Sequence, residues 1–128
     1  MKVLHFYKAA YPDSFGGVEI VVHNLANGMS SKGHSINVLS TSDKQLKTQN
    51  ISKNYRIHFS KRLFTIFSSP FSIAVIKNYK KLGKDADLIH YHYPWPFMDL
   101  LHLIYFRDKP SIVTYHSDIV RLIKLYKF

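Results

Sequence analysis

The sequence predicts a Rossmann-like α/β fold, a doubly wound parallel sheet with helices on both faces. Short apolar or β-branched runs alternate with longer stretches of helical periodicity along most of the 128 residues. Such alternation is typical of β-α-β units in a parallel sheet. The chain has the length of one domain, and its 46% hydrophobic residues suffice for a core. We therefore expect residues 1–128 to form a single domain.

The first forty residues predict a β-loop-α-β unit. Lys2–Phe6 is a short apolar run typical of a buried strand, and the following segment, Tyr7–Gly16, contains turn-forming residues. One apolar helical stripe comes next, formed by Val18, Val21, Val22, Leu25 and Met29. Gly33 ends this helix, and His34–Ser40 is a β-branched strand. The spacing suits a right-handed parallel crossover.

The middle of the chain is less regular. Asp43–Asn54 is polar and predicts a loop, whereas Tyr55–Ser60 and Leu63–Phe67 predict short strands. Pro70 fits the first turn of a helix that runs to about Leu82.

The remaining segments continue the alternation. Asp87–His92 and Ser111–Tyr115 are expected strands, and Phe97–Phe106 is an expected helix between them. Asp118–Phe128 starts a further helix without a glycine or proline to end it. We therefore expect the chain to be truncated.

Positive charge is concentrated in one third of the chain. The net charge is +10, and residues 44–84 carry ten Lys or Arg and no Asp or Glu, while the rest balances. Four of these side chains share one face of the expected helix, namely Lys77, Lys80, Lys81 and Lys84. Such a field predicts an anionic partner, either phospholipid, nucleic acid or a phosphorylated substrate.

Composition excludes several classes of protein. The chain has no cysteine, which excludes disulfides and thiolate metal sites. Its start lacks the apolar core and cleavage site of a signal peptide, and no apolar run reaches the roughly 18 residues of a membrane span. The expected location is the cytoplasm.

Ligands of an open parallel sheet bind outside the carboxyl ends of its strands. Gly16 and Gly17 follow the first strand there and open the first helix, where free N–H groups can bind a phosphate. The alternative is that the two glycines only form the turn. Neither the dinucleotide fingerprint nor the P-loop is present.

Histidines end two of the later strands. His90 and His92 lie on one face of their strand because side chains alternate with period two. We interpret His90 as a hydrogen-bonded core residue and His92, nearer the strand end, as a site residue. His116 ends the next strand in the same way. Imidazoles there can donate to hydroxyls or phosphates and transfer protons near neutral pH.

Two other readings of this region are less favoured. A metal site needs a third ligand, and none is convincingly spaced, so no metal is expected. Ser117 or Asp118 is better explained as the cap of the last helix than as a catalytic residue. We expect Gly16, His92 and His116 to converge at the carboxyl edge of the sheet.

These motifs, in this order, resemble the N-terminal domain of bacterial GT-B glycosyltransferases of the retaining group 1, family 4-like kind. The resemblance covers essentially the whole chain. Its pieces are Lys2–Phe6, Phe15-Gly16-Gly17-Val18-Glu19, Leu25-Ala26, Lys32-Gly33-His34, Asp87-Leu88-Ile89-His90-Tyr91-His92 and Val113-Thr114-Tyr115-His116. Each piece is weak alone, but the ordered set is fairly specific.

The resemblance implies two Rossmann-like domains across a cleft, the N-terminal one on the acceptor side. It implies that Gly16 and Gly17 approach the donor diphosphate, that His116 is catalytic beside the transferred sugar, and that His92 and Glu19 bind the acceptor. The nucleotide-sugar is the donor substrate, and no metal or other cofactor is implied. The C-terminal nucleotide-sugar domain is absent from this sequence, so we expect the chain alone to be inactive.

The implied reaction moves a hexose, with retention, to a cell-envelope glycan or lipid-linked acceptor. Leu63–Ile76, rich in Phe and Ile and flanked by basic residues, could then contact an anionic membrane at the inner face of the plasma membrane. An ordinary solvated basic face is the alternative.

Two further hypotheses compete with a glycosyltransferase. The chain could be a non-catalytic basic Rossmann-like module that binds anionic membrane or nucleic acid, although no nucleic-acid motif is present and none is expected to bind. It could also be an α/β enzyme that uses another cofactor, which the missing dinucleotide fingerprint disfavours.

Overall fold

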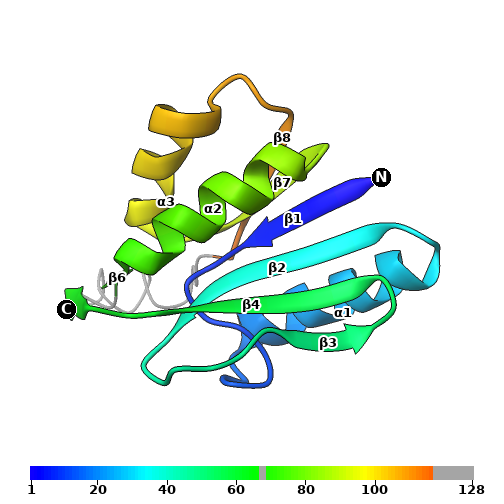
Figure 1. Ribbon diagram of the computed structural model, residues 1–128, viewed down its shortest axis with the longest axis horizontal. Coiled ribbons are helices and arrows are strands. Elements are labelled where there is room, and N and C mark those ends of the chain that lie inside the picture. Colours follow the sequence, from blue (N-terminus) through cyan, green and yellow to red (C-terminus); the bar gives the residue numbers. More distant parts are fainter. Residues whose placement is uncertain (67–68, 117–128) are drawn as a thin grey trace, which may run out of the picture.

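A six-stranded sheet forms the centre of the structure, a computed structural model that describes residues 1–66 and 69–116 (Figure 1). The strand order is β3-β4-β2-β1-β7-β8. The strands are β1 (Lys2–Phe6), β2 (Ser35–Ser42), β3 (Gln49–Ser52), β4 (Tyr55–Lys61), β7 (Leu88–Tyr93) and β8 (Ser111–Tyr115). Neighbours are parallel, except for the antiparallel edge pair β3–β4.

Strand β1 occupies the middle of the sheet because its side chains are apolar enough to be buried on both faces. It pairs in parallel with β2 on one side and β7 on the other, so that Phe6 lies opposite both Leu39 and Tyr91. All three of these side chains are buried. This arrangement confirms the predicted β-loop-α-β unit.

Helices cover both faces of the sheet (Figure 1), as the sequence predicted. Helix α1 (Gly17–Ser31) packs Val22 and Ala26 into the core on one face. The other face is covered by α2 (Ile73–Asp85) and α3 (Pro96–Leu101), which continues into a π-helical turn, η1 (His102–Phe106). The core between these helices and the sheet contains Phe6, Tyr79, Tyr91 and Trp95.

Two expectations for the middle of the chain were wrong in detail. The polar segment Asp43–Asn54 contains the strand β3. An edge strand is only half-buried and can be made of polar residues, so the sequence of β3 lacks the apolar pattern that indicates a strand. Pro70 lies in β6 (Ser69–Phe71), which pairs with β5 (Phe64–Ile66) in a two-stranded ribbon, and not in the helix. The expected helix after Asp118 lies outside the described residues.

Helix α2 begins later than expected because Ser72 caps it. The Ser72 hydroxyl accepts from the Val75 N–H at 3.1 Å and donates to the Lys61 carbonyl at 2.7 Å. The first turn of α2 is thereby attached to the carboxyl end of β4. No helix in the described ranges is both long and apolar enough to cross a bilayer.

The C-terminal end of α2 is closed by the segment after η1. The Lys109 ammonium group donates to the carbonyls of Gly83 at 2.6 Å and Ala86 at 2.7 Å, which neutralises the negative end of the helix dipole. Phe106 packs so closely on the helix that a Cβ at Gly83 would overlap its ring. Position 83 therefore has no room for a side chain, and only glycine fits there without displacing Phe106.

We expect opposite effects from two helical Gly→Ala substitutions. Gly83→Ala should lower the free energy of unfolding by about 1–3 kcal/mol, because the added methyl displaces Phe106. Gly28→Ala in α1, where a Cβ meets open space, should raise it by about 0.5–1 kcal/mol through helix propensity. Urea unfolding of both variants measures this, and equal changes in the two would contradict the packing described.

Candidate functional site

The candidate site lies at the carboxyl ends of β1, β7 and β8. From β1 the chain crosses through α1 to β2 on one side, whereas β7 and β8 lie on the other side. The strand order thus changes direction between β1 and β7, and such a switch point is where open α/β sheets bind ligands.

Four histidines, here called the histidine cluster, meet near this edge: His5, His90, His92 and His116. His5 Nδ1 lies 2.9 Å from His92 Nε2, and His92 Nδ1 lies 3.0 Å from His116 Nε2. The His90 ring stacks on His92, with centroids 4.2 Å apart, and its Nε2 lies 2.6 Å from Thr114 Oγ1. Three adjacent strands thus contribute to one connected group.

The burial of the two β7 histidines is the reverse of what the sequence suggested. His92, expected at an accessible strand end, is 0% exposed, whereas His90, expected in the core, is half-buried. The reason is that β1 and β8 both flank β7 and bring His5 and His116 against the two nitrogens of His92. His116, which follows β8 and is half-buried, lies beyond His92 toward the edge. Direct contact between His92 and an acceptor is therefore obstructed.

Burial makes these imidazoles neutral. It lowers the pKa of His5 to about 3, helped by the charge of His90. It lowers the pKa of His92 to about 2, with further repulsion from His90, His5 and His116. Burial also lowers the pKa of His90 and of His116. Neutral imidazoles each offer one donor and one acceptor, so the cluster acts through hydrogen bonds and not through charge.

The sequence analysis missed His5. In the sequence His5 stands out only as a single imidazole inside an otherwise apolar strand. The histidine that it contacts can be identified only when the strand next to β1 is known. The parallel register places His5 opposite His90. His5 is 0% exposed, and among residues 1–66 and 69–116 its Nε2 has no hydrogen-bond partner.

His5 also supplies the third imidazole that the metal interpretation lacked. Within the described residues His5, His90 and His92 place one ligand atom each within 4.8 Å of one another. The rings of His90 and His92 are nearly parallel, at 16°, so their in-plane lone pairs do not converge on a tetrahedral centre. Both nitrogens of His92 already face other imidazoles. This arrangement fits a hydrogen-bonded stack better than a metal site.

The glycine pair lies at the start of α1, on the same edge. Gly16 has an ordinary extended backbone, with φ −63°, so its role is spatial: a Cβ there would overlap the Glu19 carboxylate. Glu19 is buried and accepts from the Ser14 hydroxyl at 3.3 Å. A Cβ at Gly17 meets open space.

Glu19 also acts on Tyr7. Burial, and then the Glu19 charge, raise the pKa of the Tyr7 hydroxyl to about 12. The buried carboxylate therefore lies close enough to the loop after β1 to act on Tyr7.

One further charged group at this edge was not predicted. Arg62 follows β4, and its Nε donates to Thr41 Oγ1 at 2.8 Å while Nη2 donates to the Lys8 carbonyl at 3.0 Å. It ties the ends of β2 and β4 to the loop after β1. In the sequence it was one of ten basic residues, with nothing to single it out.

The expected convergence of Gly16, His92 and His116 holds for the histidines, which are in contact. The glycines and Glu19 form a second group at the same edge, at the start of α1. The two groups come from opposite sides of the switch point, as a ligand that bridges them would require.

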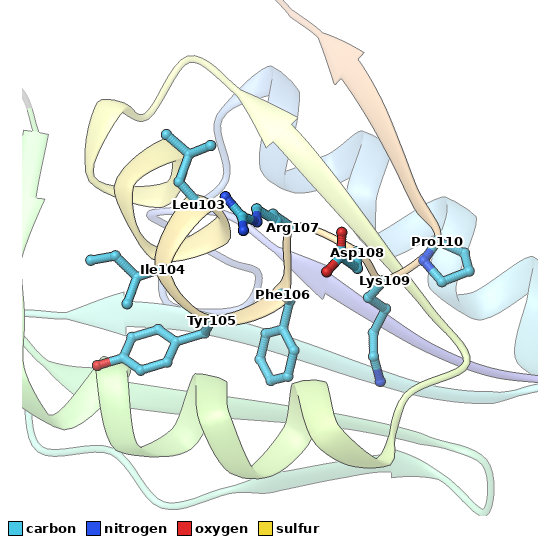
Figure 2. A pocket seen from close by; sticks show the side chains of 8 residues that line it. All are labelled: Leu103, Ile104, Tyr105, Phe106, Arg107, Asp108, Lys109 and Pro110. Carbon is cyan, nitrogen blue, oxygen red and sulfur yellow. The ribbon is translucent and has the colours of Figure 1, made fainter.

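A cavity of about 750 Å³ lies elsewhere. Figure 2 shows that it is lined by the consecutive residues Leu103–Pro110, which belong to η1 and to the turn that leads from it to β8. This is the amino end of β8, opposite the histidine cluster. The cavity is therefore separate from the candidate site.

The sheet order and the switch point between β1 and β7 define a Rossmann-like α/β domain. The chain belongs to glycosyltransferase family 4, whose family model matches residues 15–127. This confirms the resemblance that the sequence motifs indicated.

Two relatives are similar over nearly the whole chain. It is 43% identical to the O-antigen chain mannosyltransferase C of Escherichia coli over 130 residues, 99% of this chain and 35% of that protein. It is 39% identical to the D-rhamnosyltransferase WbpZ of Pseudomonas aeruginosa, over 99% of this chain and 34% of that protein. The chain thus spans about a third of the length of these relatives.

A solved structure shows the same fold. The sucrose-phosphate synthase of Thermosynechococcus elongatus superposes with a TM-score of 0.66 at 14% identity, over 99% of this chain and 35% of the synthase. The likeness confirms the Rossmann-like fold prediction.

The neutral buried histidines predict acid sensitivity. In the unfolded chain a histidine binds a proton below about pH 6.5. In the folded protein His5 has a pKa of about 3 and His92 a pKa of about 2, so both stay neutral until the pH is much lower. Stability is therefore complete above pH 6.5 and falls as the pH decreases, by about 1.4 kcal/mol per pH unit for each histidine.

Urea unfolding between pH 7.5 and 5 measures this slope. His92→Asn removes one of the two groups and should reduce the slope by about 1.4 kcal/mol per pH unit. An unfolding free energy that stays constant from pH 7.5 to 5 would contradict the neutral, buried state of the cluster.

Proposed function

We propose that this chain forms the acceptor-side domain of a GT-B hexosyltransferase, facing a second domain that binds the nucleotide-sugar. The observation that supports it most is the hydrogen-bonded pair His92–His116 at the switch-point edge of a family 4 chain. In the reaction the bond between the sugar C1 and the donor diphosphate breaks. The nucleoside diphosphate leaves with the electron pair of that bond, a bond from C1 to the oxygen of an acceptor hydroxyl forms with retention of configuration, and the hydroxyl proton passes to the leaving diphosphate.

The relatives suggest the class of sugar and acceptor. One is named for mannose transfer to an O-antigen chain and the other for transfer of D-rhamnose, which is 6-deoxymannose. We therefore propose a mannose-configured hexose as the donor sugar, and a cell-envelope glycan, free or lipid-linked, as the acceptor.

His116 is the proposed catalytic residue. Its Nε2 faces His92, which leaves Nδ1 as the nitrogen that can reach a ligand at the edge. A positioned neutral imidazole can hydrogen-bond a hydroxyl of the transferred sugar as charge develops at C1.

The glycine loop is the proposed diphosphate contact. Gly17 opens α1 with free backbone N–H groups and no side chain in the way, and Gly16 precedes it. Glu19 and His92 are the proposed residues of the acceptor side. Because both are buried, they are better placed to position neighbouring groups than to contact the acceptor themselves.

His116→Ala should lower kcat by about 10²- to 10³-fold in an enzyme that carries both halves of the cleft, by analogy with loss of an oxyanion donor. The matched control is His58→Ala, a partly buried imidazole on β4 that bonds Asn37 at 2.8 Å. Kinetics and thermal melts of both variants measure this. Near-normal turnover by folded His116→Ala would remove the residue from the mechanism.

A basic–apolar patch beside this edge supports peripheral membrane contact. It combines the exposed side chains Leu63, Phe64, Ile66 and Ile73 with Lys77, Lys80, Lys81 and Lys84 of α2. Ile73, Ile76 and the four lysines line a hollow of about 550 Å³. We propose that the patch binds the anionic inner surface of the plasma membrane, with apolar side chains in the interface and lysines on the headgroups.

Salt and charge removal test this contact. The protein should sediment with vesicles that contain anionic lipid at low salt and be released near 1 M salt, where the screening length is about 3 Å. Changing Lys77, Lys80, Lys81 and Lys84 to Gln should abolish binding. The charge-matched control changes four exposed lysines outside the patch, Lys32, Lys44, Lys47 and Lys53. Equal binding to neutral vesicles, or equal loss in the control, would contradict the proposal.

A further inference from the structure

The histidine cluster contains a linear chain of three imidazoles. It runs from His5 on β1, through fully buried His92 on β7, to half-buried His116 after β8. The two contacts join Nδ1 of one ring to Nε2 of the next, at 2.9 and 3.0 Å. Both nitrogens of His92 are therefore used, one in each direction.

The protons in such a chain are ordered. A neutral imidazole carries one N–H and one lone pair, so His92 can donate to only one neighbour and must accept from the other. If His92 donates to His116, then His5 donates to His92. If His116 donates to His92, then His92 donates to His5. The three rings thus have two allowed states, which we call outward and inward.

The buried end of the chain distinguishes the two states. His5 Nε2 is buried and has no hydrogen-bond partner in the part of the chain that the structure describes. In the outward state this atom is a bare lone pair, whereas in the inward state it is an N–H group without an acceptor. Among backbone groups, buried N–H groups without a partner are rarer than under-satisfied acceptors, and we apply the same preference to the imidazole. The outward state is therefore favoured, with the proton of each ring on Nδ1.

We propose that His5 is a positioning residue that, through His92, holds His116 in the form with its proton on Nδ1. His116 then presents an N–H donor, not a lone pair, to whatever binds at the edge. The catalytic consequence rests on the proposed function: the donor would serve a hydroxyl of the transferred sugar. The ordering of the protons does not depend on it.

Nitrogen-15 NMR of labelled histidine side chains shows directly which ring nitrogen carries the proton, because the two nitrogens have different chemical shifts in each tautomer. We expect His5, His92 and His116 of the unmodified protein to carry the proton on Nδ1 at neutral pH. A proton on Nε2 of His116 would overturn the proposal. So would zinc binding that shifts the signal of His92 Nε2, because a metal there takes the lone pair with which His92 accepts from His5.

Two variants of His5 separate positioning from packing. Asn and Met both place an atom at the position of Nδ1, but the Asn amide can donate, whereas the Met sulfur only accepts. His5→Asn should leave the proton of His116 on Nδ1, and His5→Met should move it to Nε2. His58→Met is the matched control outside the cluster and should leave His116 unchanged. An unchanged His116 in His5→Met would overturn the proposal.

Activity gives an independent second readout. His5→Met should lower kcat/KM about 3- to 10-fold, the scale of one neutral hydrogen bond, while His5→Asn retains most of it. If the tautomer of His116 changes as expected but kcat/KM does not, the ordering of the chain stands and the proposed sugar contact fails. The two proposals are therefore distinguishable.

Discussion

The parallel pairing of β1 with both β2 and β7 is the constraint on which the rest of the structure depends. It buries β1 on both faces and sets the register in which His5 lies opposite His90. Because β8 adds in parallel to the other side of β7, the ends of three strands reach one edge. Without this order His5 and His116 would lie apart from the two β7 histidines, and the four side chains would not form one connected cluster.

Buried polar side chains lie on both sides of this edge, and they differ in kind. On the side of β7 and β8 the buried groups are imidazoles that stay neutral, because burial lowers the pKa of each. On the side of α1 the buried group is the carboxylate of Glu19, which a glycine accommodates and a serine hydroxyl contacts. A ligand at the switch point would meet hydrogen-bond donors and acceptors on one side and free helix N–H groups on the other. This combination suits a substrate that is part sugar and part phosphate.

The sequence predicted most of the fold, because buried parallel strands and an amphipathic helix have strong periodicity. It failed at β3, a polar edge strand, and at Pro70, where the local preference of proline for a helix start competed with a ribbon that forms only in the folded chain. In the site, the contact between His92 and His116 follows from two histidines at the ends of successive strands. His5 could not be found in this way, because the sequence does not reveal that β7 is the second neighbour of β1.

The position of α2 links the two proposed surfaces. Ser72 bonds to the carbonyl of Lys61, so the helix starts at the carboxyl end of β4, on the edge of the sheet that carries the histidine cluster. Ile73 and the β5–β6 ribbon therefore lie near this edge, while the lysines extend along α2 away from it. A membrane that contacts the patch would meet the protein beside the proposed acceptor side. If both proposals hold, a lipid-linked acceptor in that membrane would approach the sheet on the side that carries the histidine cluster, because the start of α2 belongs to both surfaces.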